Sequence, residues 1–186
     1  MKYKKILIAI TTFTFVFVGA WFLWGSNKPT QVEFLANYQL ESMDTQSLVN
    51  YLESNPNKPD DLQAQISPST LSLQNDKDSI NIDLDNEDFY LSFAPYVEQT
   101  HPCFNHVPTG CQGELPKREF EVLVTQDDGT ILFDDTVETT ANGFAGIRLP
   151  RDIEATITVT YFDQSASTTF TTQDTDGTCL TTLKLV

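Results

Sequence analysis

The stretch that decides the fold class is residues 120–133, which read FEVLVTQDDGTILF. Every second residue from Phe120 to Val124 is apolar, a period typical of a strand that buries one face. The turn sequence Asp-Asp-Gly follows at 127–129, and apolar residues resume at Ile131. Because glycine readily adopts the positive φ that tight turns require, the stretch predicts a β-hairpin.

Short stretches with the same period of two flank this hairpin on both sides. They lie at 71–73, 80–84, 89–94, 144–149, 155–161, 165–171 and 178–185. Strands of this length that follow one another without intervening helices are typical of an antiparallel sandwich. The sequence therefore predicts a mainly β protein, with an antiparallel β-sandwich over residues 66–186.

A small helical region precedes the predicted sandwich, at residues 26–65. Phe34, Leu35 and Tyr38 are spaced for one helix face, and Asp44 is placed to cap a second short helix. Two short amphipathic helices cannot fully bury their apolar faces against one another. We therefore expect residues 31–55 to mediate self-association, most simply as a homodimer.

The N-terminal residues 1–25 have the character of a targeting segment. Three lysines lie within the first five residues, and the 20 residues Ile6–Gly25 that follow carry no charge. A run of this length matches the hydrocarbon thickness of a bilayer. Cleavage after Ala20 would leave Trp21 at a new terminus, so we favour an uncleaved signal-anchor over a signal peptide. The lysines stay inside, which places residues 26–186 in the periplasm or on the outer cell surface.

The charge of the chain excludes one class of partner. The net charge is −15, and three of the 11 basic residues precede the apolar run, which leaves 8 to face 26 acidic residues. Phosphate contacts need cationic side chains, so this surface repels DNA and RNA. We expect no nucleic-acid partner.

One irregular segment, residues 97–116, holds most of the residues with metal-ligand chemistry. Of the two histidines and three cysteines in the chain, four lie here and one lies near the C-terminus: His101, Cys103, His106, Cys111 and Cys179. Thiolate and imidazole together suit Cu(I) or Zn(II), whereas Ca(II) and Mg(II) prefer oxygen. Zinc normally takes four ligands, so a three-thiolate site favours Cu(I), with zinc as the weaker alternative.

The rival interpretation is a structural disulfide in a surface scaffold or adhesion domain. Exported cysteines tend to pair, and an odd number leaves one thiol over. Among the three pairings we favour Cys111 with Cys179, because Cys103 follows Pro102 and has less freedom to turn. The sequence has no Ser/His/Asp arrangement or phosphate-binding loop, so it does not predict an enzyme of those kinds.

Several motifs give the sequence a resemblance to a known family. FYLSFAPYV at 89–97, THPC at 100–103, His106 and CQGEL at 111–115 resemble the CueP family of extracytoplasmic copper-binding proteins. NGF at 142–144, LPR at 149–151 and DGTC at 176–179 agree with this resemblance.

The resemblance implies copper resistance and supply of copper to an exported copper-dependent enzyme. It also implies thiol ligands at Cys103, Cys111 and Cys179, a dimerising helical part, and reduction of Cu(II) and Fe(III) by the thiols. The better-known members are soluble and periplasmic, whereas this sequence predicts a membrane anchor.

Overall fold

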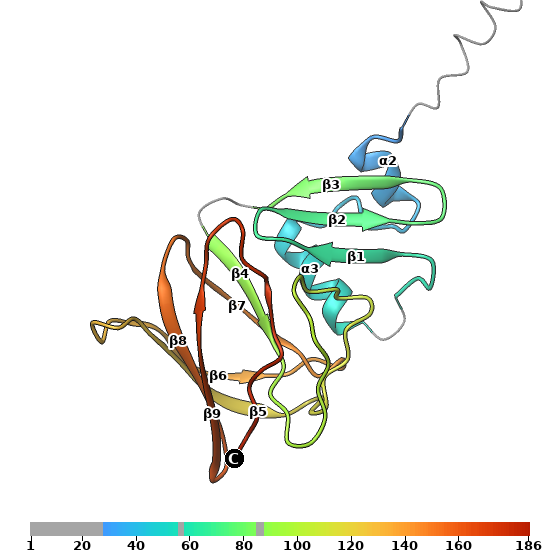
Figure 1. Cartoon of the computed structure of the whole chain (residues 1–186). Helices are drawn as coiled ribbons and strands as arrows, with labels where there is room; N and C mark the ends of the chain where they lie inside the picture. Colours follow the sequence, from blue (N-terminus) through green and yellow to red (C-terminus); the bar gives the residue numbers. More distant parts are fainter. Residues whose placement is uncertain (1–27, 56–57, 85–87) are drawn as a thin grey trace, which may run out of the picture.

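The computed structural model describes residues 28–55, 58–84 and 88–186 (Figure 1). Its helices are α2 (Gln31–Ala36) and α3 (Thr45–Ser54). Its strands are β1 (Gln63–Ile66), β2 (Thr70–Gln74), β3 (Ser79–Asp83), β4 (Asp88–Phe93), β5 (Glu119–Thr125), β6 (Ile131–Glu138), β7 (Ala145–Pro150), β8 (Glu154–Tyr161), β9 (Gln164–Thr171) and β10 (Cys179–Leu180). The predicted transmembrane helix at residues 6–25 lies outside the described residues. Among the residues that are described, no helix combines the length and apolar character needed to span a membrane.

The strands form three sheets, which confirms the mainly β prediction. Their orders are β1-β2-β3, β10-β4-β7 and β6-β5-β8-β9. The second and third sheets face one another across a single apolar core, as a sandwich does. The core consists of the inward residues of β4, β5, β7, β8 and β9, among them Phe89, Phe93, Phe120, Ile147 and Ile157.

The hairpin predicted at 120–133 is confirmed. Strands β5 and β6 pair antiparallel, from Glu119 opposite Glu138 to Thr125 opposite Ile131. Gly129 in the turn has a φ of 86°, the left-handed conformation that favours glycine.

The C-terminal strand differs from the prediction in two ways. The segment 178–185 forms only the short strand β10 and an isolated bridge between Tyr96 and Lys184, and β10 pairs with β4 in parallel. The sandwich is therefore not wholly antiparallel. The reason lies in the connection: residues 172–178 form no strand after β9, and the chain then runs beside β4 in the same direction.

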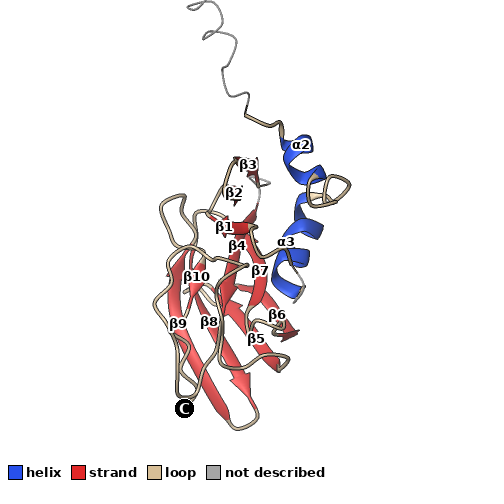
Figure 2. Cartoon of the chain, turned by 90° about the vertical axis from the view of Figure 1, so that its right-hand side faces the viewer, coloured by secondary structure: helices blue, strands red, loops and turns tan. Residues whose placement is uncertain are grey.

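The predicted helices exist, and their apolar faces are covered. Asp44 caps α3 by accepting a hydrogen bond of 2.8 Å from the Ser47 amide, as expected. Both helices lie on one side of the molecule, next to the sheet β1-β2-β3 (Figure 2). The residues of this second core are Phe34, Leu35, Leu40, Leu48, Val49, Leu52, Leu71, Leu73, Ile80 and Ile82 among others. The apolar helix surface that suggested self-association is thus buried within one chain.

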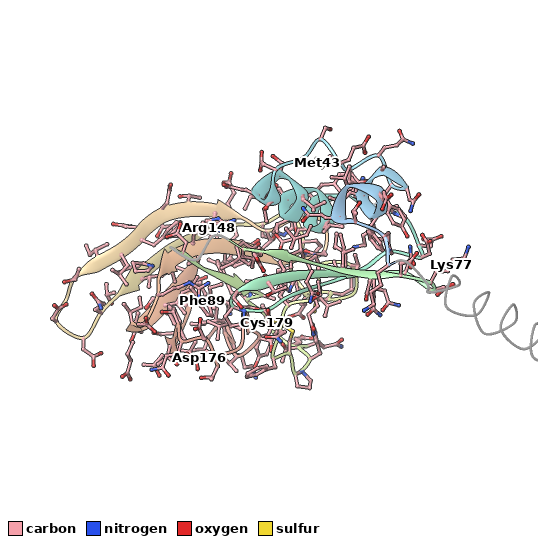
Figure 3. The ribbon with its side chains drawn as sticks, turned by 90° about the horizontal axis from the view of Figure 1, so that it is seen from above. Met43, Lys77, Phe89, Arg148, Asp176 and Cys179 are labelled. Carbon is pink, nitrogen blue, oxygen red and sulfur yellow. A yellow bond between two sulfur atoms is a disulfide. The ribbon has the colours of Figure 1, made fainter. Side chains whose placement is uncertain are left out.

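Strand β4 joins the two cores. Phe89, Leu91 and Phe93 face the sandwich, whereas Tyr90 packs with the helices and β1–β3. Seen from above, Cys179 lies near the middle of the molecule, with Met43 and Lys77 at its periphery (Figure 3). Cys179 pairs with Ser92 of β4, so it lies beside the strand that joins the two cores.

Candidate metal centre

The irregular segment predicted to hold the ligands is fixed on two sides by hydrogen bonds. On the side of the helical part, the Ile66 amide donates to the His106 carbonyl at 2.8 Å, and the Ala64 amide donates to Thr109 Oγ1 at 3.0 Å. Lys58 Nζ donates to the carbonyl of Pro108 at 2.9 Å. Strand β1 and the chain before it therefore hold residues 106–109 in place.

Thr178 fixes the same segment from the C-terminal side. Its buried hydroxyl accepts a hydrogen bond of 3.0 Å from the His106 amide and donates one of 2.6 Å to the Ile66 carbonyl. At Gly177 a Cβ would come within 2.6 Å of the Phe104 carbonyl oxygen, so the close approach of this turn needs glycine. The Cys179 amide then donates to that carbonyl at 3.1 Å. These contacts bring β10 beside the segment that carries Cys103.

A disulfide joins Cys103 to Cys179, whose Cα atoms lie 5.8 Å apart. The pairing of Cys111 with Cys179 that we favoured from the sequence is therefore wrong. The backbone contact between Cys179 and Phe104 explains the difference, because it places the two bonded residues side by side despite the preceding Pro102. Cys111 remains a buried free thiol.

All five residues chosen from the sequence come together, in two overlapping groups. His101, Cys103 and Cys111 form one group, and their potential ligand atoms lie within 4.8 Å of one another. His106, Cys111 and Cys179 form the second group within the same distance. Cys111 belongs to both, with its Sγ 3.6 Å from that of Cys103.

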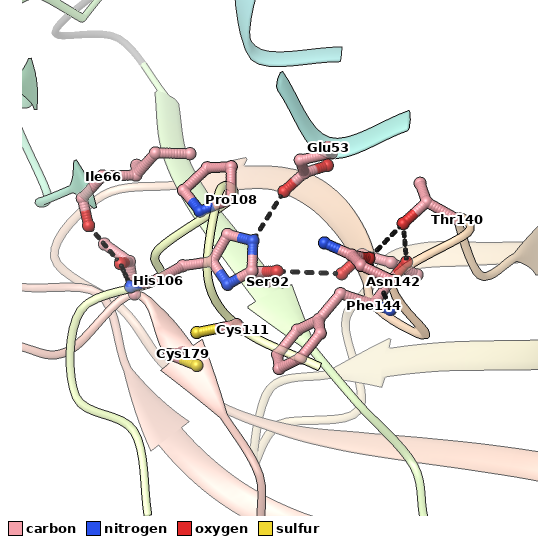
Figure 4. A network of polar contacts seen from close by, with 12 residues as sticks. Glu53, Ile66, Ser92, His106, Pro108, Cys111, Thr140, Asn142, Phe144 and Cys179 are labelled. Carbon is pink, nitrogen blue, oxygen red and sulfur yellow. Dashed lines mark hydrogen bonds and ion pairs between the residues drawn. The ribbon is translucent and has the colours of Figure 1, made fainter. Parts of the chain in front are cut away.

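The two groups differ in their exposure. His101 and Cys103 are half-buried, whereas His106 has no exposed surface and packs its ring 4.7 Å from that of Phe144. Figure 4 shows His106 between Glu53 on one side and the sulfurs of Cys111 and Cys179 on the other. The group that contains His101 is therefore the more accessible of the two.

The pKa of the Cys111 thiol is lower than that of an ordinary cysteine. Burial acts to raise its pKa, but hydrogen bonds with the imidazoles of His106 and His101 and with the Val107 backbone outweigh burial and bring the pKa to about 7. A low thiol pKa favours the thiolate, which is the form that binds metals and attacks disulfides. For His106 burial acts to lower the pKa, and its contacts with Cys111 and Glu53 raise it above the ordinary value.

Glu53 is a site residue that the sequence analysis missed. Its Oε1 lies 3.0 Å from Nε2 of His106, an ion pair when the imidazole is protonated. A signal for it exists in the sequence, because Glu53 follows Val49 by four residues and so falls on the apolar face of α3. Glu114, three residues after Cys111 in the sequence, accepts hydrogen bonds from the amides of Val97 and Glu98.

Three sulfurs and two imidazoles held between a β-sandwich and a small helical part define a candidate site for a soft metal ion. The comparisons with known proteins agree with this class. The chain belongs to the CueP family, described as periplasmic copper-binding protein CueP, whose sequence profile matches residues 47–184. Family membership supports an extracytoplasmic, copper-binding protein.

A solved structure extends the match. The crystal structure of S.CueP is similar to this fold with a TM-score of 0.79 and 37% sequence identity. The match covers 85% of this chain and 99% of that one. No curated protein matches the chain.

Proposed function

We propose that the chain binds copper as Cu(I) outside the cytosol, with Cys103, Cys111 and Cys179 as thiolate ligands. His106 or His101 approaches as a further ligand. The observation that carries the proposal is the gathering of all five side chains into two groups that share Cys111, with their ligand atoms within 4.8 Å. Soft sulfur donors with imidazole suit Cu(I), and zinc is the weaker alternative.

The Cys103–Cys179 disulfide must be reduced before all three thiolates can bind copper. In the disulfide form, Cys103 and Cys179 are bonded to each other and are not available as thiolates. A dithiol that closes to this disulfide loses two electrons and two protons, and two Cu(II) ions that each accept one electron become Cu(I). The proposal therefore includes thiol-driven reduction of Cu(II), with Fe(III) as a second acceptor. In its reduced form the protein would serve copper resistance, by sequestration of Cu(I) or by its delivery to an exported copper-dependent enzyme.

A surface scaffold or adhesion domain with a structural disulfide is the competing function. The Cys103–Cys179 bond alone fits either function. A purely structural bridge, however, gives no reason for a third thiol 3.6 Å from one of its sulfurs, with its pKa brought to about 7 by two imidazoles. This arrangement favours the metal centre. We keep the homodimer as a proposal that rests on the resemblance to the family, since the apolar helix faces that first suggested it are largely covered within one chain.

We further propose that residues 6–25 anchor the protein in the cytoplasmic membrane, with residues 26–186 outside. The support is the uncharged run of 20 residues behind three lysines. Fractionation of host cells and sequencing of the mature N-terminus test this. A soluble product that begins at Trp21 or later would show that the segment is cleaved.

The decisive test of copper binding is an anaerobic titration of the reduced protein with Cu(I), in competition with a chelator of known affinity. We expect one Cu(I) to bind per chain, and the oxidised protein to compete far less well. Equal competition by the two forms would contradict the proposal, since a scaffold with a structural bridge predicts no dependence on the thiols.

A further inference from the structure

Glu53 occupies an unfavourable place for a carboxylate. It is 5% exposed and lies in the last turn of α3, on the same face as Val49 and Leu52. Burial of an ionised carboxylate is costly unless it is paired and hydrogen-bonded. The C-terminal end of a helix also carries partial negative charge, which repels an acidic side chain. Both effects disfavour the ionised carboxylate of Glu53, which therefore needs hydrogen-bond donors or a positive charge beside it.

Two buried partners offset this cost. Nε2 of His106 lies 3.0 Å from Oε1 of Glu53, and the Tyr90 hydroxyl also hydrogen-bonds to Glu53. Burial, followed by the charge of Glu53, raises the pKa of Tyr90 well above its ordinary value, so Tyr90 stays a neutral donor. Gly146 makes room for it, because a Cβ there would overlap the Tyr90 hydroxyl. Glu53 is thus contacted both by Tyr90 of β4 and by the imidazole of His106.

The contact with Glu53 determines which ring nitrogen of His106 is available. Because Nε2 lies 3.0 Å from the carboxylate, Nδ1 is the ring nitrogen left to face Cys111, whose thiol contacts the imidazole. The ring cannot easily turn away, because it packs at 4.7 Å against Phe144 and its backbone is bonded to Thr178. Figure 4 shows this order, from Glu53 through the imidazole to the sulfurs of Cys111 and Cys179.

We infer that Glu53 is a positioning residue of the metal centre, which accepts a hydrogen bond from Nε2 of His106 and thereby holds Nδ1 toward Cys111 and Cys179. The inference rests on the proposed copper-binding function and deepens it. Outer carboxylates that orient a histidine ligand fix its tautomer and raise its basicity, and their loss typically costs about 10–100-fold in metal affinity. Helix α3 is then a component of the metal centre, although every ligand comes from the β-rich part of the chain.

The test compares three variants in the reduced protein, with Cu(I) as the probe and a competing chelator. Glu53→Ala should lower Cu(I) affinity about 10–100-fold. Glu53→Gln should lose less, because the amide oxygen still accepts from Nε2. Glu98→Gln is the matched control, since it removes an equal charge from the exposed surface of the segment 97–116, and it should keep the parental affinity. X-ray absorption should show a smaller imidazole-nitrogen contribution at the copper of Glu53→Ala than at the copper of the parent.

A metal-free measurement separates this inference from the proposed function. In the parent, ¹⁵N NMR of labelled histidine should show a slowly exchanging Nε2–H for His106, and Glu53→Ala should lose it. Should Glu53→Ala not fold, as judged by denaturant unfolding, Glu53→Gln decides through its affinity and its Nε2–H resonance. A parent that fails to bind Cu(I) while its Nε2–H is protected would overturn the proposed function alone. Parental affinity and an unchanged copper–nitrogen signal in a folded Glu53→Ala would overturn the positioning role alone.

Discussion

The Sγ of Cys111 lies 3.6 Å from the Sγ of Cys103, although Cys103 is bonded to Cys179 and not to Cys111. The three sulfurs are therefore gathered while two of them are oxidised. Reduction of one bond changes the number of available thiols from one to three, with two imidazoles already beside them. We therefore expect the redox state of the protein, more than a change of fold, to control its capacity for a soft metal.

Replacement of each cysteine by serine tests the three-thiolate site. In the reduced protein, we expect each variant to lose more Cu(I) affinity than the roughly 10–100-fold that outer-shell changes cost. The reason is that a serine hydroxyl is a hard, protonated group at neutral pH. Competition with a chelator measures the effect. If Cys103→Ser alone keeps the parental Cu(I) affinity, the site uses two sulfurs and a histidine completes it. If all three variants keep that affinity, the three-thiolate site is excluded.

The free thiol of the oxidised protein should react with iodoacetamide in a pH-dependent manner. The rate follows the thiolate fraction, so it should rise with pH and reach half its maximum near pH 7, the pKa of Cys111. Below that pH the thiol is protonated and the rate falls. His101→Gln removes one of the hydrogen bonds that lower the pKa, so its midpoint should move to higher pH. The urea-unfolded protein is the control, with a midpoint of about 8.5; the same midpoint in the folded protein would contradict the prediction.

Thr178→Val should destabilise the protein by about 1–3 kcal/mol. Valine matches the shape of threonine but has no hydroxyl. The buried amide of His106 therefore loses the acceptor that Thr178 provides, and the carbonyl of Ile66 loses a donor. Urea unfolding of the oxidised protein measures the change. Thr169→Val, at an exposed position on β9, is the matched control and should stay within about 0.5 kcal/mol of the parent. An equal effect of the two variants would show that the Thr178 contacts contribute nothing specific.

Reduction of the disulfide should lower the free energy of unfolding by about 2–4 kcal/mol. The bond joins residues 76 positions apart, so opening it greatly increases the freedom of the unfolded chain. Cu(I) binding should restore stability to the reduced protein, by about 2.7 kcal/mol at 100 times the dissociation constant. Anaerobic urea unfolding with and without reductant measures both changes. Reductant should not change the free energy of unfolding of the double variant Cys103→Ser/Cys179→Ser. A parent whose free energy of unfolding is also unchanged by reductant would contradict the prediction.

Much of the β-rich part could be predicted because its strands are defined by local patterns. The alternation in β5, the Asp-Asp-Gly turn and the renewed apolar stretch in β6 are encoded within 14 consecutive residues. The ligand types were equally accessible, since the chain holds only three cysteines and two histidines. The parallel pairing of β10 with β4 could not be predicted from the sequence. It joins segments almost 90 positions apart, and it depends on the path of the chain between them.

The sequence by itself determined the mainly β class, the two short helices, the set of soft donors and the resemblance to the CueP family. The tertiary structure decided which cysteines are bonded and which carboxylate faces the imidazole. Cys103 meets Cys179 because the backbone of Phe104 pairs with that of Cys179, and Glu53 reaches His106 because α3 packs where the two cores meet. Such contacts join residues that are distant along the chain, and no periodicity or local spacing encodes them.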